Sequence, residues 1–199
     1  MRLGMVIDTS RCIGCHTCAV ACKVANNLPN HIWWNKVVTE GATGDFPNNS
    51  PIYKTMNCQH CDNPPCMSVC PPGAISKNAG NGVVTLDSDM CLGCQACLHV
   101  CPYDALAFND VEPEYYVGHA LGEFDAPVHR HNTMGKCTFC SNRLERGDKP
   151  ACMELCVTRA RFWGDLDDPN SDVSRALQGR TYAKLSEERA TGPNVYFLK

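Results

Sequence analysis

Sixteen cysteines fall into four groups of four, and their spacing constrains this 199-residue chain more than any other feature. Groups one and three share the spacing C-x2-C-x2-C-x3-C. Group two has two extra residues before its third cysteine, and group four joins a C-x2-C pair to a later C-x3-C pair. The groups are Cys12, Cys15, Cys18 and Cys22; Cys58, Cys61, Cys66 and Cys70; Cys91, Cys94, Cys97 and Cys101; and Cys137, Cys140, Cys152 and Cys156. Side-chain packing alone requires no such repeat.

The repeated spacing is that of bacterial two-cluster ferredoxins, in which three neighbouring thiolates bind one 4Fe-4S cluster and the fourth cysteine binds the other cluster. Sixteen ligands at four per cluster predict four 4Fe-4S clusters. Because the fourth cysteine crosses over, we expect groups one and four to share one unit, and groups two and three another. The predicted ligand sets are Cys12, Cys15, Cys18 and Cys156; Cys58, Cys61, Cys66 and Cys101; Cys91, Cys94, Cys97 and Cys70; and Cys137, Cys140, Cys152 and Cys22.

Three other uses of these residues fit the pattern less well. A secreted disulfide scaffold has a similar cysteine content, but the many C-x2-C pairs would close very small loops, and no signal peptide precedes residue 12. Group four alone would suit structural zinc, although the three ferredoxin-like groups beside it favour iron. His16, His60 and His99 lie within the groups, but every ligand position already holds a cysteine, so we do not expect a Rieske cluster.

Composition and charge exclude several functional classes. The chain is 44% hydrophobic with a formal net charge of −3, and four loaded clusters would make it about −11, which disfavours a nucleic-acid partner. No run of 18 apolar residues, signal core or twin-arginine leader occurs, so any export would depend on another chain. No nucleotide-binding or hydrolase motif occurs, and we expect no catalytic residue.

Six basic residues lie near group four: Lys136, Arg143, Arg146, Lys149, Arg159 and Arg161. They would either raise the reduction potential of a nearby cluster or form a solvated face.

The pattern predicts an α+β fold made of two nested ferredoxin-like units with short strands, short helices and long loops. The inserted unit should contain strands at 74–76, 83–86 and 105–108 and short helices at 66–70 and 97–101. The outer unit should contain strands at 3–8 and 161–164 and a helix at 18–26. The expected organisation is residues 1–26 plus 137–164 as the outer unit, 27–57 as a connection, 58–110 as the inserted unit, 111–136 as a variable loop and 165–199 as a tail.

Longer motifs give the chain a family resemblance over nearly its whole length. They include Cys12-Ile13-Gly14-Cys15, Cys61-Asp62-Asn63-Pro64-Pro65-Cys66, Lys136-Cys137-Thr138-Phe139-Cys140, Arg143-Leu144-Glu145-Arg146-Gly147 and Gly192-Pro193-Asn194-Val195-Tyr196-Phe197. With this order of motifs the chain resembles the four-cluster iron-sulfur subunits of molybdopterin oxidoreductases, above all those of dimethyl-sulfoxide, polysulfide and respiratory arsenate reductases.

The resemblance implies a non-catalytic electron-transfer subunit. It would relay single electrons between a membrane quinol or a soluble donor and a separate molybdopterin catalytic subunit that holds molybdenum or tungsten. The cluster of Cys12 would face that subunit and the cluster of Cys91 the donor, which a membrane anchor subunit with a quinol site could supply. We expect a soluble subunit of a complex peripheral to a prokaryotic cell membrane, on a side that the sequence leaves open. The alternative is a free-standing polyferredoxin that serves several enzymes; the substrate, the direction of flow and the potentials stay open.

Overall fold

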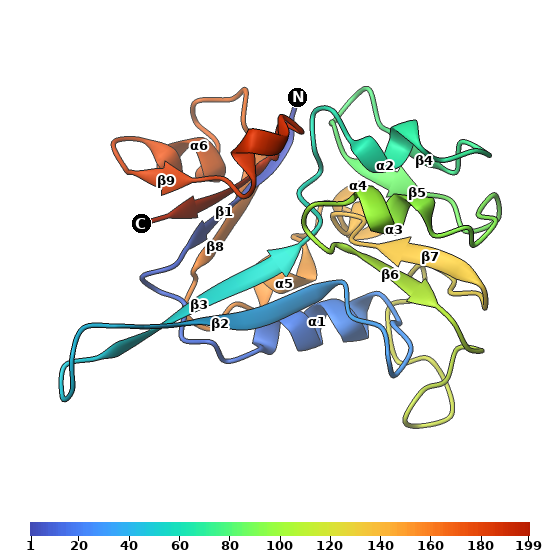
Figure 1. The fold of residues 1–199 in the computed structure, drawn as a ribbon, viewed down its shortest axis with the longest axis horizontal. Coiled ribbons are helices and arrows are strands. Elements are labelled where there is room, and N and C mark those ends of the chain that lie inside the picture. Colours follow the sequence, from blue (N-terminus) through green and yellow to red (C-terminus); the bar gives the residue numbers. More distant parts are fainter.

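A four-stranded sheet at one end of the molecule is joined to a region of short helices and two-stranded sheets (Figure 1). The computed structural model describes residues 1–199. The strand order of the large sheet is β8-β1-β10-β9, with β1 antiparallel to β8 and parallel to β10. Its strands are β1 (Leu3–Asp8), β8 (Arg161–Asp165), β9 (Tyr182–Ala183) and β10 (Val195–Leu198). The first and the last strand of the chain are therefore neighbours.

Strand β1 is buried along its whole length, as expected of a strand covered on both faces. Because side chains alternate between the faces of a strand, its odd and even residues pack against different neighbours. Val6 packs with Val173 of helix α6 (Asp172–Leu177) on one face. Leu3 and Ile7 belong to the largest buried cluster on the other face. Five of that cluster's fifteen members are cysteines, so thiols make up a third of the largest core cluster.

Most predicted elements are confirmed within a few residues. The predicted strands at 3–8 and 161–164 are β1 and β8, and the predicted helix at 18–26 is α1 (Thr17–Ala25). The remaining elements of the cysteine-rich region are α2 (Pro65–Ser68), β4 (Ile75–Lys77), β5 (Val84–Leu86), α3 (Ala96–Val100), β6 (Leu106–Asn109), β7 (Thr133–Lys136), α4 (Ser141–Glu145) and α5 (Ala151–Glu154). Strands β4 and β5, which match the predicted strands at 74–76 and 83–86, form an antiparallel hairpin, and β6 pairs with β7.

Two segments are more ordered than the sequence predicted. The connection 27–57 contains a long hairpin of β2 (Asn35–Thr43) and β3 (Ser50–Asn57), whose loop projects from the body of the molecule (Figure 1). The outer half of β2 is exposed, so it has no apolar alternation that would have identified a strand. The segment 165–199 is not an appended tail: it contains α6, a turn of 3-10 helix at Glu187–Arg189 and β10, and β10 lies inside the main sheet. The structure is thus a mixed α/β fold with few short helices, while the division into nested units stays a prediction.

Candidate metal centres

The predicted sets of cysteines lie together in space although their members come from distant parts of the chain. Three cavities are each lined by one complete set: Cys12, Cys15, Cys18 and Cys156; Cys58, Cys61, Cys66 and Cys101; and Cys91, Cys94, Cys97 and Cys70. These are called the Cys12, Cys58 and Cys91 sites below. All sixteen cysteines are free thiols. No group of three or more His, Cys, Asp or Glu side chains is gathered as the ligands of a single metal ion would be.

The fourth set, the Cys137 site, consists of Cys137, Cys140, Cys152 and Cys22. Burial raises the pKa of the Cys22 thiol well above its usual value, and the charges of the other three thiols raise it further. The Asn26 amide Nδ2 lies 3.7 Å from Cys22 Sγ and 3.9 Å from Cys140 Sγ, and so connects a cysteine of group one with a cysteine of group four. Asn26 is buried and was not identified from the sequence.

The same backbone turn occurs at the start of all four cysteine groups. The third residue of each C-x2-C motif has a left-handed backbone: Gly14 (φ 66°), His60 (φ 44°), Gly93 (φ 67°) and Phe139 (φ 60°). Glycine adopts this conformation readily, whereas His60 and Phe139 adopt it although they carry side chains. A Cβ atom at Gly14 would collide with the ring of Tyr53, and one at Gly93 with the carbonyl oxygen of Asn132. Glycine is therefore required at these two positions for two reasons, the left-handed backbone and the lack of space for a Cβ atom.

Helix α1 serves two sites at once. Cys18 and Cys22 are four residues apart on it, so they lie on the same face one turn from each other. Cys18 lines the Cys12 site, and Cys22 belongs to the Cys137 site. The i, i+4 spacing that is found within a ferredoxin group thus brings two neighbouring sites close together.

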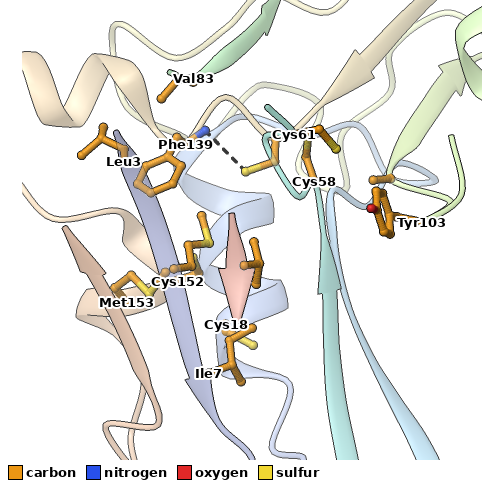
Figure 2. Packing of buried hydrophobic residues seen from close by; sticks show 14 of the residues in the cluster. Leu3, Ile7, Cys18, Cys58, Cys61, Val83, Tyr103, Phe139, Cys152 and Met153 are labelled. Carbon is orange, nitrogen blue, oxygen red and sulfur yellow. Dashed lines mark hydrogen bonds between the residues drawn. The ribbon is translucent and has the colours of Figure 1, made fainter. Parts of the chain in front are cut away.

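Backbone amides donate to several of the sulfur atoms. Phe139 N lies 3.4 Å from Cys137 Sγ, a hydrogen bond drawn in Figure 2 among the buried side chains around it. Ala160 N lies 3.3 Å from Cys156 Sγ, and Met134 N lies 3.4 Å from Cys91 Sγ. Amide hydrogen bonds to sulfur stabilise thiolates and are among the factors that set the potentials of iron-sulfur clusters.

Burial raises the pKa of many of the thiols. The pKa of Cys66 is raised to about 12, and those of Cys61, Cys97 and Cys152 to about 11. These thiols are protonated at neutral pH in the metal-free chain. A bound metal deprotonates a coordinating thiol, because its positive charge compensates the thiolate. Loading these sites with metal should therefore release protons.

Two buried cations show that the residues present fit an anionic group. Lys136 and Arg161 are the only buried lysine and arginine of the chain. The Lys136 Nζ donates to the carbonyl oxygens of Val84 and Cys137. The Arg161 Nη2 donates to Asn57 Oδ1 at 3.1 Å, while its Nε and Nη1 have no partner. A buried cation without a carboxylate is costly, and a thiolate-ligated cluster with a net charge of about −2 would offset that cost.

The C-terminal segment encloses the loop of group two. Asp62 and Asn63, within the insertion that distinguishes this group, donate their backbone N–H groups to Gly192 O at 2.8 Å and Thr191 O at 2.9 Å. Thr191 also shares a hydrogen bond with the hydroxyl of Tyr103, next to the Cys58 site. The motif that begins at Gly192 was identified from the sequence, but the sequence did not indicate its role. Its role here is to hold the longer loop in place.

The three histidines that lie within the cysteine groups have different environments. His16 and His99 are exposed, and His60 is fully buried, with its Nδ1 accepting from Val84 N at 3.2 Å. Burial lowers the pKa of His60 well below its usual value, so its ring is neutral. Its ring packs edge-to-face on Phe139, with 5.3 Å between the ring centroids.

Comparisons with known proteins agree with this geometry. The 4Fe-4S dicluster domain family matches residues 50–115 and 124–166, and a 4Fe-4S binding domain matches residues 3–24. The chain is 40% identical to a putative dimethyl sulfoxide reductase iron-sulfur subunit of Halobacterium salinarum, over 98% of this chain and 78% of that protein. It is 34% identical to the arsenate respiratory reductase iron-sulfur subunit ArrB of Shewanella sp., over 100% of this chain and 97% of that protein. The chain belongs to the iron-sulfur subunits of the molybdopterin oxidoreductases.

Membership of this family confirms the resemblance seen in the motifs and the predicted role. A third relative, 36% identical over 98% of this chain and 70% of its own length, is a selenate reductase subunit of Mesobacillus selenatarsenatis. This iron-sulfur subunit is a non-catalytic electron-transfer component with a catalytic partner subunit. None of its helices has the length and apolar character needed to cross a membrane.

Proposed function

We propose that this subunit holds four 4Fe-4S clusters, one in each cysteine site, and relays electrons between a donor and a catalytic subunit that contains molybdopterin. The main support is that each crosswise set of four cysteines predicted from the ferredoxin spacing lies together in the folded chain. When bound, the clusters supply one-electron transfer, which makes and breaks no bonds in the chain. The chain itself positions the ligands, excludes water and supplies fixed charge.

Contacts between the sites support a linear order. Arg161 lies where the first two sites meet, because it lines the cavity of the Cys12 site and its strand β8 packs against α5, which carries Cys152 of the Cys137 site. Burial, followed by the charge of Cys58, raises the pKa of Cys137, which makes the Cys137 and Cys58 sites neighbours. A second buried cluster then contains cysteines of both the Cys58 and the Cys91 sites. The resulting order is Cys12 site, Cys137 site, Cys58 site and Cys91 site.

The two end sites suit electron exchange with partners. Cys15 and Cys94 are the only exposed cysteines, and they belong to the Cys12 and Cys91 sites. Large apolar side chains are exposed beside both sites, including Ile13 next to one and Leu92 next to the other. We assign the Cys12 end to the molybdenum or tungsten subunit, and the Cys91 end to a membrane anchor subunit with a quinol site or to a soluble donor. This polarity rests on the family resemblance, and it would hold the subunit at the membrane through its partners.

Metal analysis tests the cofactor assignment. Anaerobic measurement should find about sixteen iron and sixteen sulfide ions per chain, with the brown colour of 4Fe-4S clusters. Zinc in place of iron would overturn the proposal.

Isolation of the native complex tests the partner assignment. A molybdopterin-containing subunit should copurify in a fixed ratio to this chain. Two exposed end sites would equally serve a free-standing polyferredoxin, and a monomer that exchanges electrons with several enzymes would favour that alternative.

A further inference from the structure

Positive charge near group four divides into two kinds in the folded chain. Arg143 forms ion pairs with Glu123 and Glu154, and Arg146 forms ion pairs with Glu123 and Asp125 at the surface. The paired carboxylates offset the positive charge of both arginines. Lys136 and Arg161 have no carboxylate partner and are 1% and 6% exposed. Lys149 and Arg159 are exposed, so Lys136 and Arg161 are the only fully buried cations of the group.

Arg161 lies between the Cys12 site and the Cys137 site. It is the first residue of β8, pairs with Ile7 across the sheet and lines the cavity of the Cys12 site. Strand β8 also packs against helix α5, which carries Cys152 of the Cys137 site, so Arg161 lies where elements of the two sites meet. Its Nε and Nη1 atoms are buried and have no partner in the protein.

Lys136 lies between the Cys137 site and the Cys58 site. It is the last residue of β7, directly before Cys137, and its side chain lines the cavity of the Cys58 site. Its Nζ donates to the carbonyl oxygen of Cys137, a member of the first site, and to that of Val84, which lines the cavity of the second. The Cys137 site is therefore flanked by both cations, whereas neither lines the cavity of the Cys91 site.

We propose that Arg161 and Lys136 each hold a fixed positive charge between two neighbouring cluster sites and thereby raise the reduction potentials of both clusters. Reduction adds one electron to a cluster and forms no bond, so a nearby cation stabilises the reduced form. The effect is large in a buried, weakly screened environment. The Cys137 cluster should be raised most and the Cys91 cluster least. The inference rests on the proposed function, because it requires clusters in these sites.

Redox titration followed by electron paramagnetic resonance tests the charges one at a time in the loaded, full-length chain. Arg161→Gln should lower the potentials of the Cys12 and Cys137 clusters, each by about a tenfold change in its reduction equilibrium. Lys136→Met should do the same to the Cys137 and Cys58 clusters. Arg161→Lys and Lys136→Arg should keep potentials close to those of the wild type. Arg146→Gln, the matched surface control, should change none.

The outcomes separate this inference from the proposed function. A wild-type chain without four iron-sulfur clusters would refute the function itself. Wild-type potentials in fully loaded Arg161→Gln and Lys136→Met chains would refute only the inference that these two charges raise the cluster potentials. If a neutral variant loses clusters while its charge-retaining counterpart binds all four, the buried charge is needed to compensate the clusters, as proposed. If both variants at one position lose clusters, shape rather than charge matters there, and the inference is wrong for that residue.

Discussion

The two inner sites and the two end sites use the same loop conformation with different residues. At the end sites the left-handed position is glycine, because Tyr53 or Asn132 leaves no room for a side chain. At the inner sites it is His60 and Phe139, whose rings pack on each other in the core. A residue with a side chain in this conformation costs about 1–2 kcal/mol. The inner sites thus combine a strained backbone with packing between two aromatic rings. At the end sites, neighbouring atoms lie directly against the glycine.

Burial separates the two kinds of site in the same way. Seven of the eight cysteines of the Cys58 and Cys137 sites are buried, against two of eight in the Cys12 and Cys91 sites. Four cysteines of the inner sites belong to the largest core cluster, whereas Cys18 is its only member from an end site. The inner sites therefore contribute to folding, and the end sites should contribute mainly to exchange with partners.

The largest expected difference between inner and end sites concerns stability. Cys137→Ser should lower the free energy of unfolding of the loaded chain by about 3 kcal/mol or more, because a core metal site contributes directly to folding. Cys94→Ser should leave the fold close to that of the wild type. Anaerobic denaturant unfolding and iron analysis of the two variants measure this difference, and equal losses of stability would break the distinction.

For electron delivery, in contrast to stability, we expect Cys94→Ser to have a large effect. With a ligand missing at the Cys91 end, reduction by the physiological donor should fail. An artificial dye that reduces the catalytic subunit directly should still support turnover. Loss of both activities in a complex that remains assembled would show that the assigned polarity is wrong.

A smaller effect on stability tests the close contacts around the glycines of the end sites. Gly93→Ala should destabilise the chain by about 2 kcal/mol or more, since the new Cβ meets both an unfavourable φ and the Asn132 backbone. Gly73→Ala is the matched control, with a φ of 72° but no atom within 4 Å, and should cost only about 1 kcal/mol. Thermal unfolding of both chains decides the point, and equal losses would mean that the collision is relieved by local movement.

The smallest expected effect depends on pH and lies beside the Cys12 end. Asp8, 1% exposed at the end of β1, binds Arg180 at 2.7 Å. Burial raises the pKa of Asp8, but hydrogen bonds from Arg180 and Ser10 lower it more, so the net pKa is below its usual value. A lowered carboxyl pKa stabilises the fold above the unfolded pKa, and this contribution is lost as the pH falls through the folded pKa.

Asp8→Asn should therefore be less stable than the wild type by about 1 kcal/mol at pH 7. The gap should narrow below about pH 4. Unfolding of the two chains across this pH range provides the measurement. A gap that is independent of pH would assign the stabilising effect to packing rather than to charge.

Local spacing made the cysteine-rich region largely predictable. The hairpin of β4 and β5 and the helix α1 follow from short-range patterns, and the crosswise ligand sets follow from the ferredoxin rule. Those sets do come together in the structure, although iron ligation itself stays a prediction. The hairpin of β2 and β3 was missed because its exposed half shows no alternation, and β10 because its partners lie at the other end of the chain.

The sequence by itself determined the number and spacing of the cysteines and the family, because a cysteine motif is specified by residues a few positions apart. Only the tertiary structure decided which charges matter. Lys136 and Arg161 looked the same as Arg143 and Arg146 in the sequence, yet the first two are buried without a carboxylate and the other two form ion pairs with carboxylates. Burial and ion pairing depend on contacts between residues far apart in the chain, and no local pattern records them.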